Sequence, residues 1–479
     1  MKPDWMAILP LISLWGGGLL ILCLGAFWKK HPSELLYGMA LGAVLLAGTL
    51  TVFWPARTPN FLDQLDTGGV GRYFALLIAL ITGISLLFSH QYAKARKFDI
   101  DEFYALILFA AAGMNLVAGS THWLTFFLGL ELLSLSLYVI IAIRKGHPES
   151  NEAALKYFVI GSVASAFLTF GISLLYALTG ELDIARSLAG GAPAGGSSLV
   201  FLGFSLILVG IGFKISMVPF HLWAPDVYQG APAPVTAFLS AGSKVALFSA
   251  LLRFASYTSA EVWESFTPVL WFLAVMTMGV GTICALTQLR IKRLLAYSSI
   301  AQIGYLLMAL LALKMNGAMA ILFYLAAYGL MELGAFGAIA SLSAEAGDLD
   351  LLADFQGLAD SHPWRSTILA VCLISLAGLP PTVGFIGKFS LFWAVLQSRY
   401  FFVAIIGIGA AMVSIFFYFK VVIALFTGSP ARPVMIPHLS PAHVFAGLLI
   451  LGLILGLGLI PAPLFRWIET VLPFPTSPL

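Results

Sequence analysis

Several charged side chains lie inside long apolar stretches of this sequence, and these residues are the first candidates for a functional site. Glu131, Lys244 and Glu332 lie in the interiors of three different apolar runs. A charge at the centre of a membrane-spanning helix costs about 3 kcal/mol on insertion, so it needs a paired or hydrated environment. A lysine held away from water also loses much of its preference for the charged form. These residues are therefore candidates for binding and releasing protons.

Four further lysines lie within or at the margins of apolar runs. Lys156 stands near the start of its run and Lys420 near the end of its own, where a long side chain can reach the membrane surface. Lys214 and Lys388 instead lie close to clusters of proline and glycine. Taken alone, Lys156 and Lys420 are weaker candidates than the deeper residues.

Two segments rich in proline interrupt the apolar pattern. Lys214 is followed by Pro219, His221, Pro225 and Pro232 in GFKISMVPFHLWAPDVYQGAPAPVTAFLSAGSK. The second break, at 378–381 in LAGLPPTVGFIGKF, precedes Lys388 by about two turns. Proline removes a backbone donor and clashes with the preceding turn. In lipid, the freed carbonyls must be satisfied by protein or by cavity water. The sequence therefore predicts two broken helices, each with a lysine nearby.

His221 lies inside the first break. Its ordinary pKa of about 6.5 suits a relay that passes protons between lysines through water. The alternative is a structural histidine that donates a hydrogen bond to a carbonyl freed by the break.

The elements that must position these residues follow from composition. The chain has 479 residues, of which 60% are hydrophobic and 10% charged, and its mean hydropathy is +0.98. Soluble proteins contain about 25% charged residues, so this chain belongs in a bilayer. The net charge of +3, from 25 basic and 22 acidic residues, is too small to indicate a nucleic-acid partner. Composition also excludes secreted disulfide scaffolds and disordered chains.

Apolar runs of about 20 or more residues predict an all-α polytopic membrane protein with about fourteen transmembrane helices. The first run is too long for a signal peptide, so we expect it to be retained as a helix. No run is separated from the next by enough chain for a soluble domain. The runs cover 5–28, 34–55, 73–92, 101–119, 121–143, 155–179, 198–221, 234–255, 267–288, 294–313, 316–342, 364–396, 400–427 and 442–464.

The two breaks are related by spacing. Pro219 and Pro380 are 161 residues apart, which is about the length of five helices with their connections. An odd number of crossings per unit inverts the second copy, and inverted repeats with broken helices are typical of ion transporters. The alternative is a pair of packing kinks. We expect a three-helix segment, two inverted five-helix repeats and a final helix, over 1–100, 101–255, 267–427 and 442–464.

Lysine and arginine in the loops predict the orientation. Twelve fall on one side of the membrane and eight on the other. By the positive-inside rule the richer side is cytoplasmic, which places both termini outside the cytoplasm.

No signal for a redox group or metal is present. The three cysteines, Cys23, Cys284 and Cys372, are far apart and lack ligand spacing, and the sequence has no G-x-G-x-x-G nucleotide motif. We therefore expect no cofactor in this chain, and we expect partner subunits to supply the energy that moves a proton.

Several motifs closely resemble the antiporter-like N subunits of proton-pumping NADH:quinone oxidoreductase, respiratory complex I. The resemblance spans about residues 100–430. The segments that carry it are FKISMVPFHLWAPDVYQGAPAPVTAFLSAGSKVA within 205–252, GLELLSLSLYVI around Glu131, NEAALKYFVIGSVASAFLTFGISLLYALTG around Lys156, RIKRLLAYSSIAQIGYLLM at 290–308 and LPPTVGFIGKF before Lys388.

The resemblance implies a bacterial inner-membrane protein that moves protons along a central hydrophilic axis when quinone is reduced elsewhere. Flavin, iron–sulfur clusters and quinone are then expected in partner subunits, and the other antiporter-like subunits are expected neighbours. Carried over motif by motif, the proton-transfer residues are Glu131, Lys156, Lys214, His221, Lys244 and Lys388. Protons and the lipid bilayer are further expected partners, and no nucleic acid is expected to bind.

Glu332 departs from the family pattern, in which we expect a neutral polar residue at that place in AAYGLMELGAFG. It enters the set of site residues as a tentative member. No segment of this sequence resembles the long lateral C-terminal helix of the L subunit, so we expect an N subunit and not an L subunit. Two other interpretations stay open, namely a subunit of a multisubunit sodium/proton antiporter, and a mainly structural membrane subunit whose charges only join helices. The sequence around Lys244, SAGSK, favours the N subunits over the antiporter.

Overall fold

A computed structural model describes residues 5–28, 32–53, 60–189, 197–343, 348–429 and 438–472, except for the side chains of residues 60, 197 and 314. These residues form a bundle of helices with one two-stranded antiparallel hairpin, β1 (Asn60–Phe61) and β2 (Leu65–Asp66). Of the residues counted for orientation, Lys2, Lys29, Lys30, Arg57 and Arg432 lie outside the described ranges.

The first part of the bundle runs to the first break. Its elements are η1 (Trp5–Ile8), α1 (Leu9–Phe27), α2 (Ser33–Phe53), α3 (Gly69–Ala95), α4 (Asp101–Gly119), α5 (Trp123–Ile141), α6 (Pro148–Thr179), α7 (Ile184–Ala189), α8 (Ser197–Lys214) and α9 (Trp223–Gly230).

The second part follows that break. Its elements are α10 (Ala233–Phe238), η2 (Leu239–Ser243), α11 (Lys244–Tyr257), α12 (Ala260–Leu286), α13 (Ile291–Leu310), η3 (Leu313–Gly317), α14 (Ala318–Leu342), η4 (Leu352–Phe355), α15 (Leu358–Ser361), α16 (Pro363–Ala377), α17 (Val383–Gln397), α18 (Phe401–Phe426), α19 (Pro441–Leu459) and α20 (Ala462–Val471).

Local sequence sets several of these boundaries. Helices α6 and α16 both begin at a proline, whose missing N–H would have no partner in a first turn anyway. Both end at a glycine in the left-handed region, Gly180 at φ 68° and Gly378 at φ 83°. A residue with a Cβ is strained there, so glycine stops each helix where it does.

Among the described residues, twelve helical segments are long and apolar enough to cross a membrane. The predicted runs 198–221 and 364–396 are not among them, because neither is one continuous helix. Helix α8 ends at Lys214, and α16 and α17 are separated by residues 378–382. The chain is therefore a multi-pass, all-helical membrane protein, while the count of fourteen crossings stays a prediction.

At each of the two breaks the backbone leaves the helical conformation and forms turns. Between α8 and α9 the backbone turns over residues 215–222, with a cis bond before Pro219; between α16 and α17 it turns over 378–382, with a cis bond before Pro381. A third irregularity, the π-helical segment η2, lies within an otherwise continuous helical stretch and ends immediately before Lys244. Such wide turns are often found at functional positions of helices.

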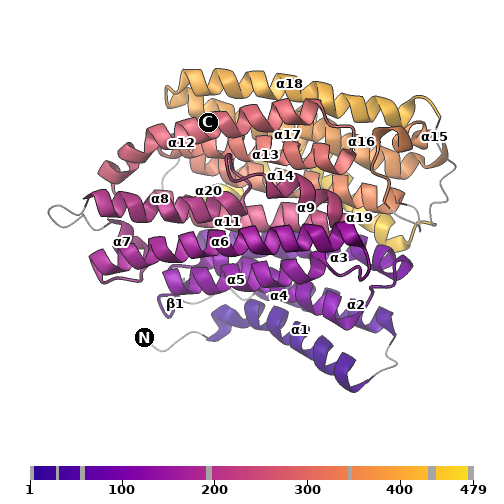
Figure 1. Ribbon diagram of the computed structural model, residues 1–479, viewed down its shortest axis with the longest axis horizontal. Coiled ribbons are helices and arrows are strands. Elements are labelled where there is room, and N and C mark those ends of the chain that lie inside the picture. The colour runs from indigo at the N-terminus through magenta and orange to yellow at the C-terminus, as the bar shows by residue number, and fades with distance from the viewer. Residues whose placement is uncertain are drawn as a thin grey trace.

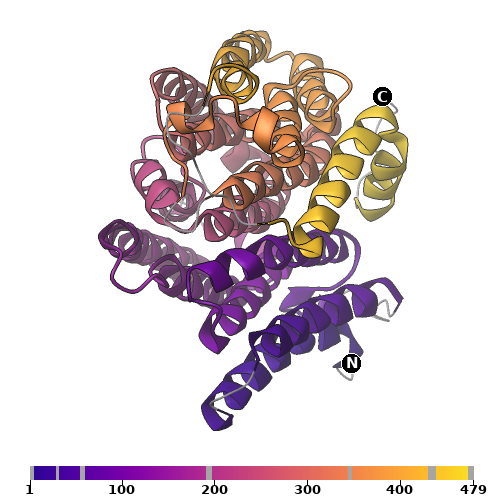
Figure 2. The ribbon, with the colours of Figure 1, turned by 90° about the vertical axis from the view of Figure 1, so that its right-hand side faces the viewer.

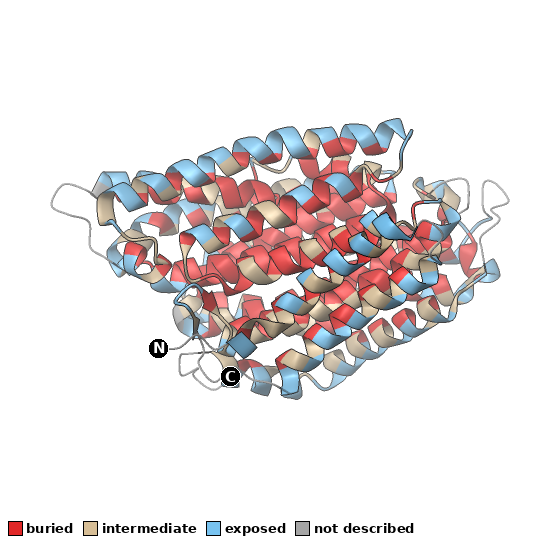
Figure 3. Cartoon of the chain, turned by 90° about the horizontal axis from the view of Figure 1, so that it is seen from below, coloured by how far each residue is buried: buried red, intermediate tan, exposed pale blue. Residues whose placement is uncertain are grey.

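Figure 1 shows α1 at one edge of the bundle and α18 at the opposite edge, and the view along the helices in Figure 2 shows the C-terminal helices against the side of the bundle. There α19 and α20 contact α3 and α14. The segment 233–257 and helix α14 are buried along their most apolar stretches. Figure 3 shows that the buried residues are concentrated in the interior of the bundle.

The last predicted run, 442–464, divides in two. Helix α19 ends at Leu459, and the separate helix α20 begins at Ala462 after Pro461. Helix α7, the short η4 and α15, and the hairpin were not predicted either, because short elements in polar connections lack the long apolar pattern on which the prediction rested.

Candidate proton-transfer site

The first buried lysine is held by hydroxyl groups of a neighbouring helix. Lys214, at the end of α8, donates to Ser134 Oγ at 2.7 Å and to Tyr138 Oη at 3.1 Å, both on α5. Glu131 lies one turn before Ser134 on the same helix and accepts a 2.5 Å hydrogen bond from Ser165 of α6. Within the described residues Lys214 makes no ion pair. The acid and the ammonium group therefore lie close to each other but are held by separate hydroxyls.

An aromatic row joins Lys214 to the centre of the chain. The Lys214 ammonium lies 6.0 Å from the Tyr157 ring centroid, and Tyr157 stacks on Trp223 at 4.6 Å. Trp223 contacts Tyr228 edge to face at 6.5 Å, and the Lys244 ammonium lies 5.5 Å from the Tyr228 ring. These rings stabilise both cations through their faces. They do not by themselves conduct protons, so transfer between the two lysines requires water.

Lys244 occupies the first turn after the π-helical segment and is 1% exposed. Its ammonium donates to Ser299 of α13, and the Ser299 hydroxyl is 2.6 Å from the Tyr328 hydroxyl of α14. The ammonium also lies 5.7 Å from the Tyr328 ring. Through the hydroxyl groups of Ser299 and Tyr328, Lys244 thus connects α11 to α13 and α14.

Glu332 lies one turn beyond Tyr328 on α14 and is 0% exposed. Neither of its carboxylate oxygens has a hydrogen-bond partner in the part of the chain that the structure describes. The hydroxyls of Ser240 and Tyr328 are its polar neighbours, and Lys244 is the cation whose charge acts on it.

Lys388, on α17, is bound to the second break. Its ammonium donates to the carbonyl oxygens of Leu376 at 2.7 Å and Ala377 at 3.4 Å, the last residues of α16. These carbonyls have no intrahelical partner because the helix stops at Gly378. The lysine therefore satisfies carbonyls that the break frees, as the sequence led us to expect, and its ammonium lies 5.1 Å from the Tyr305 ring.

Gln302 of α13 connects this lysine to the centre. Its amide Nε2 donates to Leu376 O at 3.3 Å and to Tyr418 Oη at 3.1 Å, and its Oε1 accepts from Tyr324. Leu376 O also accepts from Lys388. Gln302 lies one turn beyond Ser299, which binds Lys244. Helix α13 therefore carries polar groups that reach towards Lys244 on one side and Lys388 on the other.

Lys156 is placed differently from the other predicted lysines. Its side chain is 40% exposed and forms ion pairs with Glu152 and Asp226, both at 2.8 Å. Arg293 also binds Asp226, at 2.6 Å, and these residues line a polar cavity of about 210 Å³. Lys156 therefore belongs to an exposed charge cluster and does not join the hydroxyls that hold Lys214 and Lys244.

His221 lies in the turns between α8 and α9 and is half-buried. Its Nδ1 atom is buried and has no hydrogen-bond partner within the described residues. The flanking Pro219 and Leu222 are exposed. The structure thus leaves His221 at the surface of the chain beside the first break, and its relay role stays a prediction.

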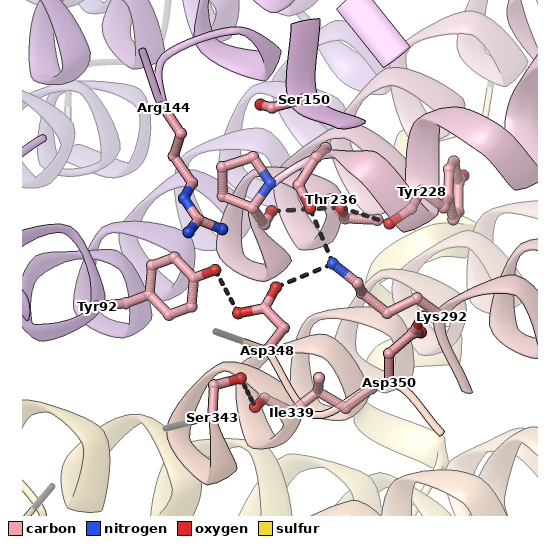
Figure 4. A network of polar contacts seen from close by, with 12 residues as sticks. Tyr92, Arg144, Ser150, Tyr228, Thr236, Lys292, Ile339, Ser343, Asp348 and Asp350 are labelled. Carbon is pink, nitrogen blue, oxygen red and sulfur yellow. Dashed lines mark hydrogen bonds and ion pairs between the residues drawn. The ribbon is translucent and has the colours of Figure 1, made fainter. Parts of the chain in front are cut away.

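A second group of buried charges surrounds Asp348 in the loop after α14. Its carboxylate accepts from Tyr92 at 2.6 Å and from Lys292 at 2.9 Å (Figure 4). It also accepts from Arg96 at 3.0 Å, and Lys292 donates to Ala231 O at 3.1 Å. Burial alone would raise the pKa of Asp348, but the two cations and the hydrogen bonds outweigh it and hold the pKa well below its ordinary value. This cluster fastens α3, α13 and the connection between α9 and α10 together.

Sequence reasoning did not identify the uncharged members of the site. They share hydroxyl or amide groups on helices α5, α6, α13, α14 and α18: Ser134, Tyr138, Ser165, Ser298, Ser299, Gln302, Tyr324, Tyr328 and Tyr418. One signal was available, since Tyr324, Tyr328 and Glu332 recur every four residues and so share one face of α14.

Comparison with known proteins defines the class. Residues 120–414 match the family model described as NADH:quinone oxidoreductase/Mrp antiporter, TM. A chain of the Mrp complex from Dietzia is similar in fold, with a TM-score of 0.82, 21% identity and coverage of 98% of this chain and 97% of that one. The fold is thus that of an antiporter-like membrane protein.

The curated relatives narrow the assignment. NADH-quinone oxidoreductase subunit N 1 of Solidesulfovibrio magneticus is 44% identical over 464 residues, which is 96% of each chain. A chain of respiratory complex I from Thermus thermophilus superposes with a TM-score of 0.80 at 32% identity, over 96% of this chain and 99% of that one. This chain belongs to the family of NADH-quinone oxidoreductase N subunits.

Proposed function

We propose that this chain is a proton-translocating subunit in the membrane of a bacterial NADH:quinone oxidoreductase. The observation that carries the proposal is the line of uncharged polar groups between two buried lysines, from Lys244 through Ser299 and Gln302 to the Leu376 carbonyl and Lys388. Hydroxyls and amides arranged between titratable groups, with water in the remaining gaps, provide a path for protons inside a membrane.

The path begins at Glu131 and Lys214. Glu131 of α5 accepts from Ser165 of α6, and Lys214 donates to Ser134 of α5. These two hydroxyl groups hold the acid and the lysine apart. When the carboxylate moves to the ammonium group, the lysine keeps its proton; when they separate, the proton can pass to Lys244. The motion that switches the pair comes from neighbouring subunits, whose charges act strongly in a medium of low dielectric constant.

The remaining parts of the proposal concern organisation. Residues 101–255 and 267–427 form two inverted repeats, each with one of the broken helices, after a three-helix segment at 1–100 and before a C-terminal segment at 442–464, which covers most of α19 and the start of α20. Both termini face the periplasm. Flavin, iron–sulfur clusters and quinone belong to partner subunits, and other antiporter-like subunits adjoin this chain. His221, and Lys156 at the polar cavity, connect the path to water.

The test is Lys244→Ala in the assembled enzyme. Removing this side chain deletes the central proton carrier, and its acceptor Ser299 keeps the Tyr328 hydroxyl as a partner, so we expect normal assembly and coupled turnover reduced by about 100-fold, the size expected when a proton carrier is lost. The measurement is proton pumping per quinone reduced in membrane vesicles. Lys420→Ala is the matched control, because Lys420 donates only a 3.5 Å bond to the Gln288 carbonyl.

Near-normal pumping by a fully assembled Lys244→Ala enzyme would contradict the proposal. A large loss in the Lys420→Ala control would show that lysine removal harms assembly and not proton transfer. Sodium is the alternative coupling ion, because the matching family model also includes Mrp antiporters. Pumping that stops in sodium-free medium would favour that second function.

A further inference from the structure

The most unusual polar group in the chain is the Glu332 carboxylate. Helix α14 is buried along its most apolar stretch, Glu332 is 0% exposed, and both of its oxygens are without a partner among the described residues. Burying an ionised carboxylate without a partner costs several kcal/mol or more. Such a residue persists only if it is neutral, hydrated or both, which are the properties of a group that exchanges a proton.

The surroundings of Glu332 lead to Lys244. Tyr328, one turn earlier on α14, places its hydroxyl 2.6 Å from Ser299 Oγ, and Ser299 accepts the hydrogen bond of Lys244. Tyr328 is also 3.5 Å from the Ser240 carbonyl oxygen, which belongs to the π-helical segment before Lys244. Lys244 and Glu332 act on each other electrostatically but make no ion pair among the described residues. Two hydroxyls thus connect the buried base to Tyr328, which lies one turn before the buried acid on α14.

We propose that Lys244 and Glu332 share one exchangeable proton, which moves between them through Ser299, Tyr328 and a bridging water. The inference deepens the proposed function and rests on it. In the forward step the Lys244 ammonium gives a proton to the Ser299 oxygen, Ser299 passes its own proton to Tyr328, and Tyr328 passes its own through water to the Glu332 carboxylate. The lysine ends as a neutral amine, the glutamate as a neutral acid, and both hydroxyls are restored.

Charge conservation makes this exchange suitable for the centre of a membrane. Before the step the two groups carry +1 and −1, and afterwards both are neutral, so their sum is zero in each state. An isolated buried charge would be far more costly than either state. Once its proton is on Glu332, the neutral Lys244 amine can accept another from the direction of Lys214. Glu332 therefore serves as the holding position that readies Lys244 for the next proton.

Other titratable groups also face Glu332 and define the controls. Besides Lys244 on α11, its charge acts on tyrosines and a cysteine of α9, α14, α16 and α18, namely Tyr228, Tyr324, Tyr328, Cys372 and Tyr418. None of these is a carboxyl group, so an acid signal from this site belongs to Glu332.

The experiment compares Glu332→Gln, Glu332→Asp and Met331→Leu in the complete enzyme. Glutamine keeps the shape but cannot titrate, aspartate keeps the carboxyl group, and Met331→Leu, at a neighbouring buried position of α14, controls for packing. We expect proton pumping per quinone reduced to fall about tenfold in Glu332→Gln, to recover to within about threefold in Glu332→Asp, and to be unchanged in Met331→Leu.

A spectroscopic readout separates proton exchange from packing. In redox-difference infrared spectra of the wild-type enzyme, a band of a protonated carboxylic acid should change on turnover and should vanish in Glu332→Gln. Equal pumping in Glu332→Gln and wild type, or a carboxyl band unaffected by the substitution, would overturn this inference. If Glu332→Gln pumped normally but Lys244→Ala did not, this inference would fail and the proposed function would stand. If both variants pumped normally, both the inference and the proposed function would fail.

Discussion

Asp348 and Glu332 are both buried carboxylates, yet the chain surrounds them in opposite ways. Asp348 receives hydrogen bonds from Lys292, Arg96 and Tyr92, so its charge is matched by two cations. Glu332 has no hydrogen-bond or ion-pair partner among the described residues. A paired charge is fixed in one protonation state and can only fasten helices together. A charge without a partner is free to change state.

The same contrast separates the lysines. Lys292 is paired with Asp348, and Lys156 is paired with two acids. In the part of the chain that the structure describes, Lys214, Lys244 and Lys388 have no acid as an ion-pair partner and bind hydroxyl or carbonyl oxygens instead. Neutral acceptors hold an ammonium group without fixing its proton, whereas a carboxylate strongly favours the charged form. We therefore expect the three lysines with neutral partners to exchange protons more readily than Lys292 and Lys156.

The largest effect should come from the cluster around Asp348, where the buried charges are paired. Asp348→Asn leaves two buried cations without their counter-charge and should lower the free energy of unfolding by about 3 kcal/mol. Labelling of the buried Cys372 during thermal unfolding of the enzyme in detergent, in a background with Cys23 and Cys284 replaced by serine, measures the change. Coupled turnover of assembled enzyme should stay within about twofold of wild type. An unchanged melting temperature would show that the cluster is not structural.

The Asp348 effect should also depend on pH. The folded-state pKa lies below the unfolded value of about 3.9, so the stabilisation is present at neutral pH and is lost as the pH falls through that value and towards the folded pKa. Melting curves of wild type and Asp348→Asn should therefore converge below about pH 4. A difference that stayed constant well below pH 4, as the folded pKa is approached, would mean that the carboxylate charge is not the cause.

The next effect concerns Lys388. Lys388→Leu removes the donor to the Leu376 and Ala377 carbonyls and should reduce pumping about tenfold, while Lys388→Glu, which still titrates and attracts water, should reduce it about threefold. Proton pumping per quinone reduced, with assembly checked by subunit content, distinguishes the two. Equal losses would mean that the positive charge of this lysine matters, and not its ability to exchange a proton.

A smaller effect should follow changes at Glu131. Glu131→Gln keeps the shape and the contact to Ser165 but deletes the charge that acts on Lys214, so coupled turnover should fall about fivefold. Glu131→Asp retains the charge and should lower it only about twofold. The measurement is again proton pumping by membranes of equal enzyme content. If both variants pumped as well as wild type, Glu131 would have no part in switching Lys214.

The sequence predicted the charged half of this site and not its neutral half. Lysine and glutamate inside apolar runs are conspicuous because each is costly there, and the proline clusters near Lys214 and Lys388 indicated where the helices stop. Ser165 and Ser299 are not conspicuous, since serine is tolerated in membrane helices and most serines bond to their own helix. Which serine faces a lysine depends on helix rotation and packing, and a single sequence does not contain either.

Lys156 shows a second limit of prediction from the sequence, because a motif does not reveal tertiary contacts. Its motif predicts a role in proton transfer, which stays a prediction, but nothing in the motif indicated its ion pair with Asp226, 70 residues further along the chain. The tertiary contact and not the motif decides whether such a lysine is paired. The same applies to Asp348, whose partners on α3 and α13 are distant in sequence and whose cluster was not predicted.

The smallest effect tests whether one neutral hydroxyl sets the balance at Glu131. Ser165 donates a 2.5 Å hydrogen bond to the Glu131 carboxylate, whereas Ser162, one turn earlier on α6, donates to the Phe158 carbonyl of its own helix. A hydrogen bond is worth about 1 kcal/mol net, so Ser165→Ala should shift the carboxylate about fivefold towards pairing with Lys214. Because a paired lysine releases its proton less readily, coupled turnover should fall about twofold. Ser162→Ala should change nothing, and an equal response of the two variants in proton-pumping rate would show that Ser165 does not hold the acid and the lysine apart.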